Sequence, residues 1–266
     1  MASADRFGYK WTKCPQLFLD DFYQEHVNRW IYPLQLRQFK GKKVLDAGCG
    51  PGRISYLLLQ NGAHVAAFDY DPRTVEICKK NLEPFKKKSV HYLSIYDSTW
   101  SNAFDFCLSI GVIHHLRDQP LAVKKLVEAV KPGGKVLVWL YGRENNGWII
   151  YFINPIRFFT SRLPIQITGL ISYLFSVPLH LATRYLPFRS PYFKILKGYG
   201  FARIHELVFD HLLPRIATYY RKEEALQLLK DAGLIDVQVF PVNKNSWTVL
   251  GVKPKVFPIN VSSTKA

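Results

Sequence analysis

Short apolar runs alternate with amphipathic segments through the middle of the chain. The apolar runs predict strands, at Lys43–Ala47, His64–Tyr70, Val90–Tyr96, Phe104–Ile110 and Lys135–Tyr141. Apolar residues at helical spacing predict helices between them, at Arg53–Asn61, from Asp71-Pro72 onward and at Leu121–Val130. Strands and helices that alternate in this way form an α/β fold with a parallel sheet, and its ligands bind at the carboxyl ends of the strands.

The two ends of the chain show different patterns. Residues 1–40 are rich in aromatics, and apolar residues recur at helical spacing from Leu19 to Ile31, which predicts an N-terminal helical cap that packs on the core or covers a substrate. Near the other end, a predicted helix precedes a β-hairpin, with bounds Lys222–Ala232, Asp236–Val242 and Trp247–Val252. The predicted domains are the cap (1–40), a core (41–141 and 221–253), an insert (142–220) and a loose tail (254–266).

The insert interrupts the alternation. From Asn145 to His205 there is no Asp or Glu, but there are seven Lys and Arg residues and thirteen aromatic residues. Residues 163–183 carry no charge, a length sufficient to cross a bilayer, although Pro164 and Pro178 interrupt the run and polar residues dilute it. Three interpretations of this helical, apolar and basic insert stay open: a transmembrane helix, an interfacial or re-entrant hairpin, and an apolar lid.

The amino-acid composition of the chain sets expectations for its binding partners and its cellular compartment. The 266 residues carry a net charge of +16, which favours an anionic partner such as nucleic acid, an acidic membrane surface or a phosphorylated substrate. The four cysteines form no CxxC pair, so we predict neither a disulfide framework nor a zinc site, and no metal. Residues 1–13 lack the apolar core of a signal peptide. We therefore expect a cytoplasmic protein, peripheral at the inner face of the membrane if the insert reaches lipid.

The main candidate ligand-binding motif is residues 44–53, whose sequence is VLDAGCGPGR. An apolar strand reaches Asp46, and glycines follow at alternate positions, Gly48, Gly50 and Gly52. Such a strand, turn and helix start let bare backbone approach a ligand closely. An acid at the mouth of the turn disfavours a phosphate, but it suits a ligand that carries an ammonium or sulfonium cation.

Two further acids end or follow the next strands. Asp69 ends the second strand, where a carboxylate accepts hydrogen bonds from both hydroxyls of a ribose. Asp97 follows the third strand, where an acid accepts from the amino group of an adenine. Together with Asp46 they suit one ligand that has an amino acid end, a ribose and an adenine.

These segments resemble the motifs of class I S-adenosylmethionine-dependent methyltransferases, of the small-molecule (UbiE/UbiG-like) type. The resemblance rests on residues 44–52 (VLDAGCGPG), 68–72 (FDYDP), 96–97 (YD), 104–106 (FDF), 109–116 (SIGVIHHL) and 131–134 (KPGG). It is strong over residues 40–141, and 221–253 also fit. It implies a Rossmann-like seven-stranded sheet of order 3-2-1-4-5-7-6 with strand 7 antiparallel, and S-adenosylmethionine as the methyl donor.

The resemblance also implies roles for single residues. Asp46 and the backbone around Gly48 and Gly50 hold the methionine end, with Gly52 completing the turn, and Asp69 holds the ribose. Around the adenine and the sulfonium it places Tyr70, Tyr96, Asp97, Ser109 and Ile110.

Methyl transfer to a hydroxyl or an amine also needs a proton acceptor, and His is the usual one near neutral pH. His114 and His115 follow the fourth strand, beside the expected methyl group, and are the candidate catalytic residues. In similar enzymes the second position of this pair takes part in catalysis, and in others it is structural.

The insert follows the fifth strand and is therefore expected to select the acceptor. Its apolar and basic composition favours a small amphiphilic or lipid-linked molecule, and O- and N-methylation both stay open. The alternative is an RNA (tRNA) methyltransferase, because basic patches with interleaved aromatics also bind nucleic acid. Against it stand the long uncharged run and the lack of an appended RNA-binding module.

Overall fold

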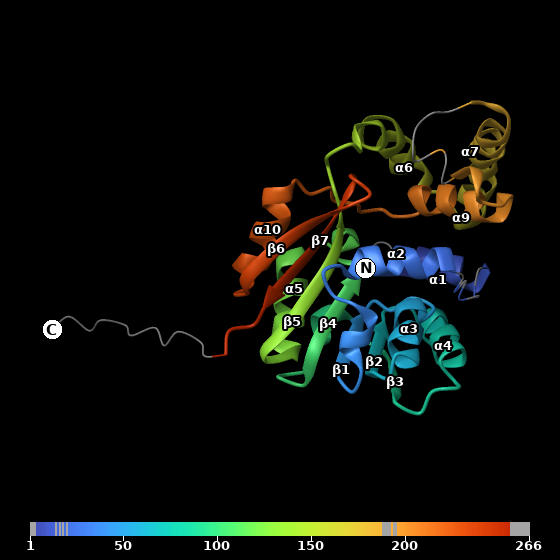
Figure 1. Cartoon of the computed structure of the whole chain (residues 1–266). Helices are drawn as coiled ribbons and strands as arrows, with labels where there is room; N and C mark the ends of the chain where they lie inside the picture. Colours follow the sequence, from blue (N-terminus) through green and yellow to red (C-terminus); the bar gives the residue numbers. More distant parts are fainter. Residues whose placement is uncertain are drawn as a thin grey trace.

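The computed structural model describes residues 4–13, 15, 17, 19, 21–187, 193 and 196–255, and it contains one seven-stranded sheet (Figure 1). Its strands are β1 (Lys43–Ala47), β2 (His64–Asp69), β3 (Lys88–Tyr92), β4 (Phe104–Ile110), β5 (Val130–Tyr141), β6 (Ile235–Val242) and β7 (Ser246–Val252). Their order is β3-β2-β1-β4-β5-β7-β6. β7 is antiparallel to β5 and β6, and the other pairs are parallel. The predicted Rossmann-like sheet is confirmed.

Two strands differ from the prediction by more than one residue. The third strand, predicted at Val90–Tyr96, occupies Lys88–Tyr92, because these residues pair with β2. The chain then turns through a short helix, η2 (Ile95–Asp97), where the Ser94 hydroxyl accepts a hydrogen bond from the Tyr96 amide at 3.2 Å. β5 begins at Val130 rather than Lys135, since Val130 already pairs with β4 before a bulge.

Helices cover both faces of the sheet. One core cluster joins α5 (Gln119–Ala129) and α10 (Lys222–Asp231) to the sheet, and a second joins α2 (Asp21–Ile31), α3 (Arg53–Gln60) and α4 (Pro72–Asn81) to the opposite face. α4 begins as predicted at Asp71-Pro72, where the Asp71 carboxylate accepts from the amides of Arg73 and Thr74. α5 begins two residues earlier than predicted, because Asp118 caps it by accepting from the Leu121 amide.

The N-terminal cap contains one helix that the apolar pattern did not predict. α1 (Ala4–Lys13) precedes α2, and a short helix, η1 (Leu36–Phe39), follows α2. α1 was missed because it buries charged residues, Arg6 and Lys10, instead of apolar ones. Arg6 donates to the carbonyls of Leu213, Leu163 and Thr160, all in the insert, which ties α1 to that part of the chain.

The insert follows β5, as predicted, and stands at the carboxyl end of the parallel strands with α1 and α2 beneath it (Figure 1). Its described helices are η4 (Ile149–Ile153), α6 (Asn154–Thr160), α7 (Ile165–Tyr185) and α9 (Phe201–Leu212). α7 is one continuous helix with Pro178 inside it, so the re-entrant hairpin considered for 163–183 is not formed. In the predicted tail, residues 256–266 lie outside the described residues.

Candidate active site

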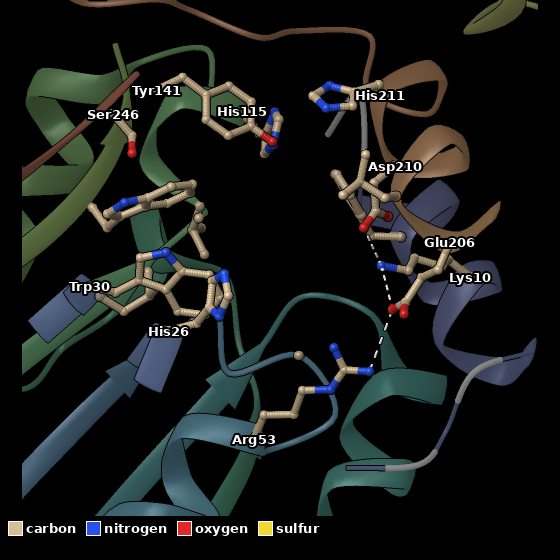
Figure 2. Close-up of a pocket in the computed structure, with 18 of the residues that line it drawn as sticks. Lys10, His26, Trp30, Arg53, His115, Tyr141, Glu206, Asp210, His211 and Ser246 are labelled. Carbon is tan, nitrogen blue, oxygen red and sulfur yellow. Dashed lines mark hydrogen bonds and ion pairs between the residues drawn. The ribbon is translucent and has the colours of Figure 1, made fainter. Parts of the chain in front are cut away.

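A cavity of about 1330 Å³ lies where the carboxyl ends of the strands meet α1, α2 and the insert. Figure 2 shows His115 and Tyr141 on one side of it and His211, Asp210 and Lys10 on another. The cavity reaches from the turn after β1 to Phe175 and Leu179 on α7. One space therefore joins the predicted cofactor site to the insert.

The glycine turn forms the floor of this cavity. Gly48 and Gly50 line it with φ angles of +78° and +54°, a backbone region that favours glycine. A Cβ at Gly48 would lie 2.4 Å from the Val112 side chain, whereas a Cβ at Gly50 would meet nothing closer than Trp11 at 3.5 Å. Gly52 faces Cys78 instead, so its part is to let α3 pack on α4.

The two acids closest to this turn have carboxylates without a cation. Asp46 is buried and accepts a hydrogen bond from the Ser55 hydroxyl at 2.6 Å. Asp69 accepts from the amides of Gly50 at 3.0 Å and Asp71 at 3.2 Å. Burial raises the pKa of each carboxyl to about 6. Among the described residues neither forms an ion pair, and uncompensated acids in a cavity fit a cationic ligand such as a sulfonium.

The other predicted cofactor residues divide into two groups. Tyr70, Tyr96 and Ile110 line the cavity. Ser109 does not, because it is fully buried and its hydroxyl donates to the Ala47 carbonyl at 3.1 Å. Asp97 is exposed at the end of η2 and is also not part of the lining. Their predicted contacts with a cofactor stay predictions.

The two candidate catalytic histidines lie in different surroundings. His114 is fully buried behind the cavity wall, its ring stacks on Tyr141 at 3.8 Å, and burial holds its pKa well below the usual range. His115 lines the cavity, and its Nδ1 lies 2.7 Å from the Ile216 carbonyl oxygen. A carbonyl only accepts, so Nδ1 carries the proton and Nε2 keeps a lone pair. Burial lowers the pKa of His115 to about 4, so its ring is neutral near pH 7.

A buried charge cluster that the sequence reasoning missed forms one wall of the cavity (Figure 2). Lys10 on α1 reaches Asp210 at 2.6 Å and Glu206 at 3.2 Å, both on α9. Glu206 also pairs with Arg53, directly after the glycine turn, and with Arg203. Burial alone would raise the pKa of Glu206, but these cations lower it to about 2. The cluster connects the cap, the core and the insert around one space.

No cluster of three or more His, Cys, Asp or Glu side chains that could hold a metal occurs in the part of the chain that the structure describes. Cys49, Cys78 and Cys107 are buried free thiols.

Comparisons with known proteins concern the core. Residues 45–138 match the family model described as "Methyltransferase domain". The mitochondrial ubiquinone biosynthesis O-methyltransferase of Schizosaccharomyces pombe is 34% identical over 104 residues, which are 38% of this chain and 38% of that protein. The ubiquinone biosynthesis O-methyltransferase of Idiomarina loihiensis is 30% identical over 115 residues, 41% of this chain and 46% of that protein. The chain thus matches less than half the length of these two relatives.

Solved structures share the fold at low sequence identity. Human N-acetylserotonin methyltransferase, in complex with S-adenosylmethionine, has a TM-score of 0.56 at 14% identity, covering 94% of this chain and 56% of that one. Magnesium protoporphyrin IX methyltransferase from Synechocystis PCC 6803, with bound S-adenosylmethionine, has a TM-score of 0.55 at 12% identity, covering 94% of each chain. These identities show the fold alone.

Proposed function

Since the core of this chain is a class I S-adenosylmethionine-dependent methyltransferase domain, we propose that the protein transfers a methyl group from S-adenosylmethionine to a small amphiphilic acceptor. The observation that carries the proposal is the continuous cavity, which joins Asp46, Gly50 and Asp69 to His115 and to the apolar residues of the insert. The O-methyltransferase relatives of the core favour an oxygen of the acceptor over a nitrogen.

The residues at the glycine turn fit the cofactor. Asp46 and the bare backbone at Gly48 and Gly50 would hold the methionine end, and Asp69 would accept from the ribose hydroxyls. Burying the Asp69 carboxylate costs free energy that two ribose hydrogen bonds offset. Tyr70 stacks on Tyr92 at 5.7 Å and offers an aromatic surface to the adenine. When bound, the sulfonium supplies an activated methyl group.

The protein's own part in the transfer is alignment and proton removal. In-line displacement at a methyl group needs the acceptor atom held close and correctly oriented, which a cavity lined by the core, the cap and the insert would provide. His115 holds its proton on Nδ1 against the Ile216 carbonyl, and Nε2 is the atom that takes a proton from the acceptor. His114, buried with neither ring nitrogen hydrogen-bonded among the described residues, supports Tyr141 and His115 from behind.

An amphiphilic acceptor fits the two ends of the cavity. Near His115 the lining contains Tyr141, Trp139 and Trp30, and the cavity extends to Phe175 and Leu179 on α7. A reactive polar head at the aromatic end and an apolar tail toward α7 would each meet matching side chains. This arrangement supports a lipid-linked or otherwise tailed small molecule.

We further propose that the outer face of the insert rests on an anionic membrane. α7 has the length and apolarity of a membrane-spanning helix, and the described residues contain one such helix. Its inward face is small and polar, with Thr168, Ser172 and Ser176 buried, whereas Leu170 and Leu174 on the outer face are 70% and 72% exposed. A helix with this reversed arrangement leaves a large apolar surface that water does not favour.

The neighbouring helices extend this surface and add charge of one sign. Tyr151, Phe152 and Phe159 on η4 and α6 are each about two-thirds or more exposed. Exposed Arg162 and Arg184 lie at either side of α7, in a segment without any acid. Exposed aromatics with flanking cations favour the interface of an anionic bilayer, and this position would bring a lipid acceptor to the outer end of the cavity. The corresponding location is peripheral, on the cytoplasmic face of the membrane.

Labelled cofactor tests the reaction and its acceptor together. The purified protein, incubated with methyl-labelled S-adenosylmethionine and a whole-cell extract, is expected to move label into the organic-solvent fraction. The Asp69→Ala variant is the matched control, and it should transfer little label at the same cofactor concentration. Label in RNA would favour the RNA alternative, and an absence of transfer to any fraction would contradict methyl transfer.

A further inference from the structure

Arg157 on α6 is a buried cation that forms no ion pair with a carboxylate among the described residues. Its side chain is only 5% exposed, and among the described residues no carboxylate lies within ion-pairing distance of its guanidinium. Its hydrogen-bond partners among the described residues are neutral: Nη1 donates to the Tyr219 hydroxyl at 3.3 Å, and Nη2 donates to the Asn154 side-chain oxygen. A buried charge without a counter-ion is costly, and such a cost is usually offset where a ligand of opposite charge binds.

Tyr219 connects this cation to the active site. It lines the cavity, and its ring stacks on Tyr141 at 5.5 Å. Its hydroxyl accepts from Arg157, and no acceptor for its own proton is found among the described residues. The Tyr219 O–H is therefore available to a ligand in the cavity, and it is polarised by the guanidinium behind it.

The positive charge of Arg157 reaches the groups around the acceptor end. After burial, it is a cause that lowers the pKa of both His115 and His211, each to about 4. A base as weak as His115 removes a proton from a hydroxyl only if the resulting oxygen anion is strongly stabilised. The guanidinium adds to the effect of burial on these two pKa values, and its charge favours an oxygen anion bound at Tyr219, whereas the Asp210 carboxylate, which raises the pKa of Tyr141, opposes it.

We propose that the acceptor reacts as an oxygen anion held by Tyr219 and Arg157. This inference rests on the proposed methyl transfer and deepens it, since it names the acceptor as an acidic hydroxyl, such as a phenol. The acceptor O–H proton passes to Nε2 of His115, and the oxygen's electron pair forms the new O–CH₃ bond. The C–S bond of the sulfonium breaks, and its electron pair stays on sulfur. Tyr219 is the catalytic residue that touches the anion, and Arg157 positions and charges it from behind.

A chromophoric phenol tests the anion site without any turnover. We would titrate 4-nitrophenol, whose phenolate absorbs visible light, into the full-length protein with S-adenosylhomocysteine at a series of pH values. The wild type is expected to bind the phenolate in preference to the neutral phenol. In Arg157→Gln the apparent pKa of the bound probe should rise by about one unit, which is about a tenfold loss of phenolate affinity. Tyr219→Phe should cause a smaller loss, about threefold, because the guanidinium remains.

Two further variants keep the result interpretable. Arg157→Lys retains the charge and is expected to restore most of the phenolate preference. Arg37→Gln removes an exposed arginine that lies outside the cavity lining and should leave the probe unchanged. Equal probe pKa values in wild type and Arg157→Gln, or no phenolate preference in the wild type, would overturn the proposal. If label transfer by the wild type succeeds, such a result sinks only the anion site; if label transfer also fails, methyl transfer itself is wrong.

Discussion

The turn after β1 and helix α6 of the insert both contain buried charged groups close to the cavity, and these groups have opposite sign. At the turn, Asp46 and Asp69 are carboxylates without a cation. In the insert, Arg157 is a buried guanidinium without a carboxylate among the described residues. The two regions thus suit two ligands of opposite sign, a cationic methyl donor and an anionic acceptor. The charges that a site leaves unpaired in its own structure indicate the charges of what it binds.

The two regions also differ in which side chains they bury. The core follows the ordinary rule, with apolar residues such as Val44, Leu45 and Phe68 inside. On α7 the rule is reversed, because Thr168, Ser172 and Ser176 face the protein, whereas Leu170 and Leu174 face outward. A large exposed apolar face marks an interaction site, which is why we propose that this face contacts a membrane.

The largest expected effect concerns the acceptor side. His115→Ala should lower turnover at saturating cofactor by at least about 100-fold, because the proton acceptor is lost. Cofactor affinity, measured by calorimetry, should stay within about twofold, since the turn is untouched. The control is His64→Ala, an exposed histidine on β2 outside the cavity lining. Unchanged turnover in His115→Ala would remove this residue from the chemistry.

The variant Asp69→Ala tests the other region, where the methyl donor is proposed to bind. We expect its affinity for S-adenosylmethionine to fall by about 1–3 kcal/mol, because two hydrogen bonds to the ribose are lost. Calorimetry measures this change, and Asp231→Ala, an exposed acid on α10, is the matched control. If Asp69→Ala and Asp231→Ala bind the cofactor equally well, the ribose assignment fails. Asp97→Ala in the same series decides whether the exposed Asp97 contacts the adenine.

The next largest expected effect concerns the proposed contact between α7 and a membrane. Leu170→Ser combined with Leu174→Ser should reduce co-sedimentation with vesicles of anionic phospholipid by about tenfold, because part of the apolar burial of two leucine side chains at the membrane surface is lost. Substituting exposed Lys124 and Lys222 on the core, far from α7, is the control for a merely electrostatic attraction. Retention that disappears at high salt in the wild type would argue against insertion of the apolar face.

The smallest expected effect is the pH dependence of cofactor affinity. The folded-state pKa of Asp46 and of Asp69 is raised to about 6, so both carboxyls are ionised above this pH and become protonated below it. A cationic ligand prefers the ionised forms, and its affinity should therefore fall by about threefold to tenfold between about pH 7 and pH 5. Calorimetry across this range is the measurement, and Asp69→Asn should show a shallower dependence. A flat wild-type profile would mean that neither carboxyl senses the sulfonium.

The donor side could be predicted from sequence because its residues are contiguous. Asp46, Gly48 and Gly50 lie within one strand and turn, and Asp69 ends the next strand, so local pattern suffices to place them at one edge. Ser109 fell in the right strand, but a side chain in a strand points to one of two faces, and its hydroxyl is used inside the sheet.

The acceptor side could not be predicted in the same way. Lys10 meets Asp210 across 200 positions of sequence, and Arg157 meets Tyr219 across 62. Such pairs depend on how α1, α6 and α9 pack together. The spacing of apolar residues along the sequence does not reveal that packing. α1 itself was not predicted, because Arg6 and Lys10, which it buries, are charged rather than apolar. The acid-free composition indicated where the acceptor side would be, though not which of its cations would be buried.

The bond between Lys10 and Asp210 has a consequence for how the protein is made. A chain leaves the ribosome from its amino end, so α1 emerges before α9, and Lys10 must wait for a partner that is made 200 residues later. The core strands β1 to β5 and their glycine turn are complete well before that moment. During synthesis the glycine turn is therefore made before the cavity wall that Lys10 forms with α9, and this wall closes only once α9 has emerged.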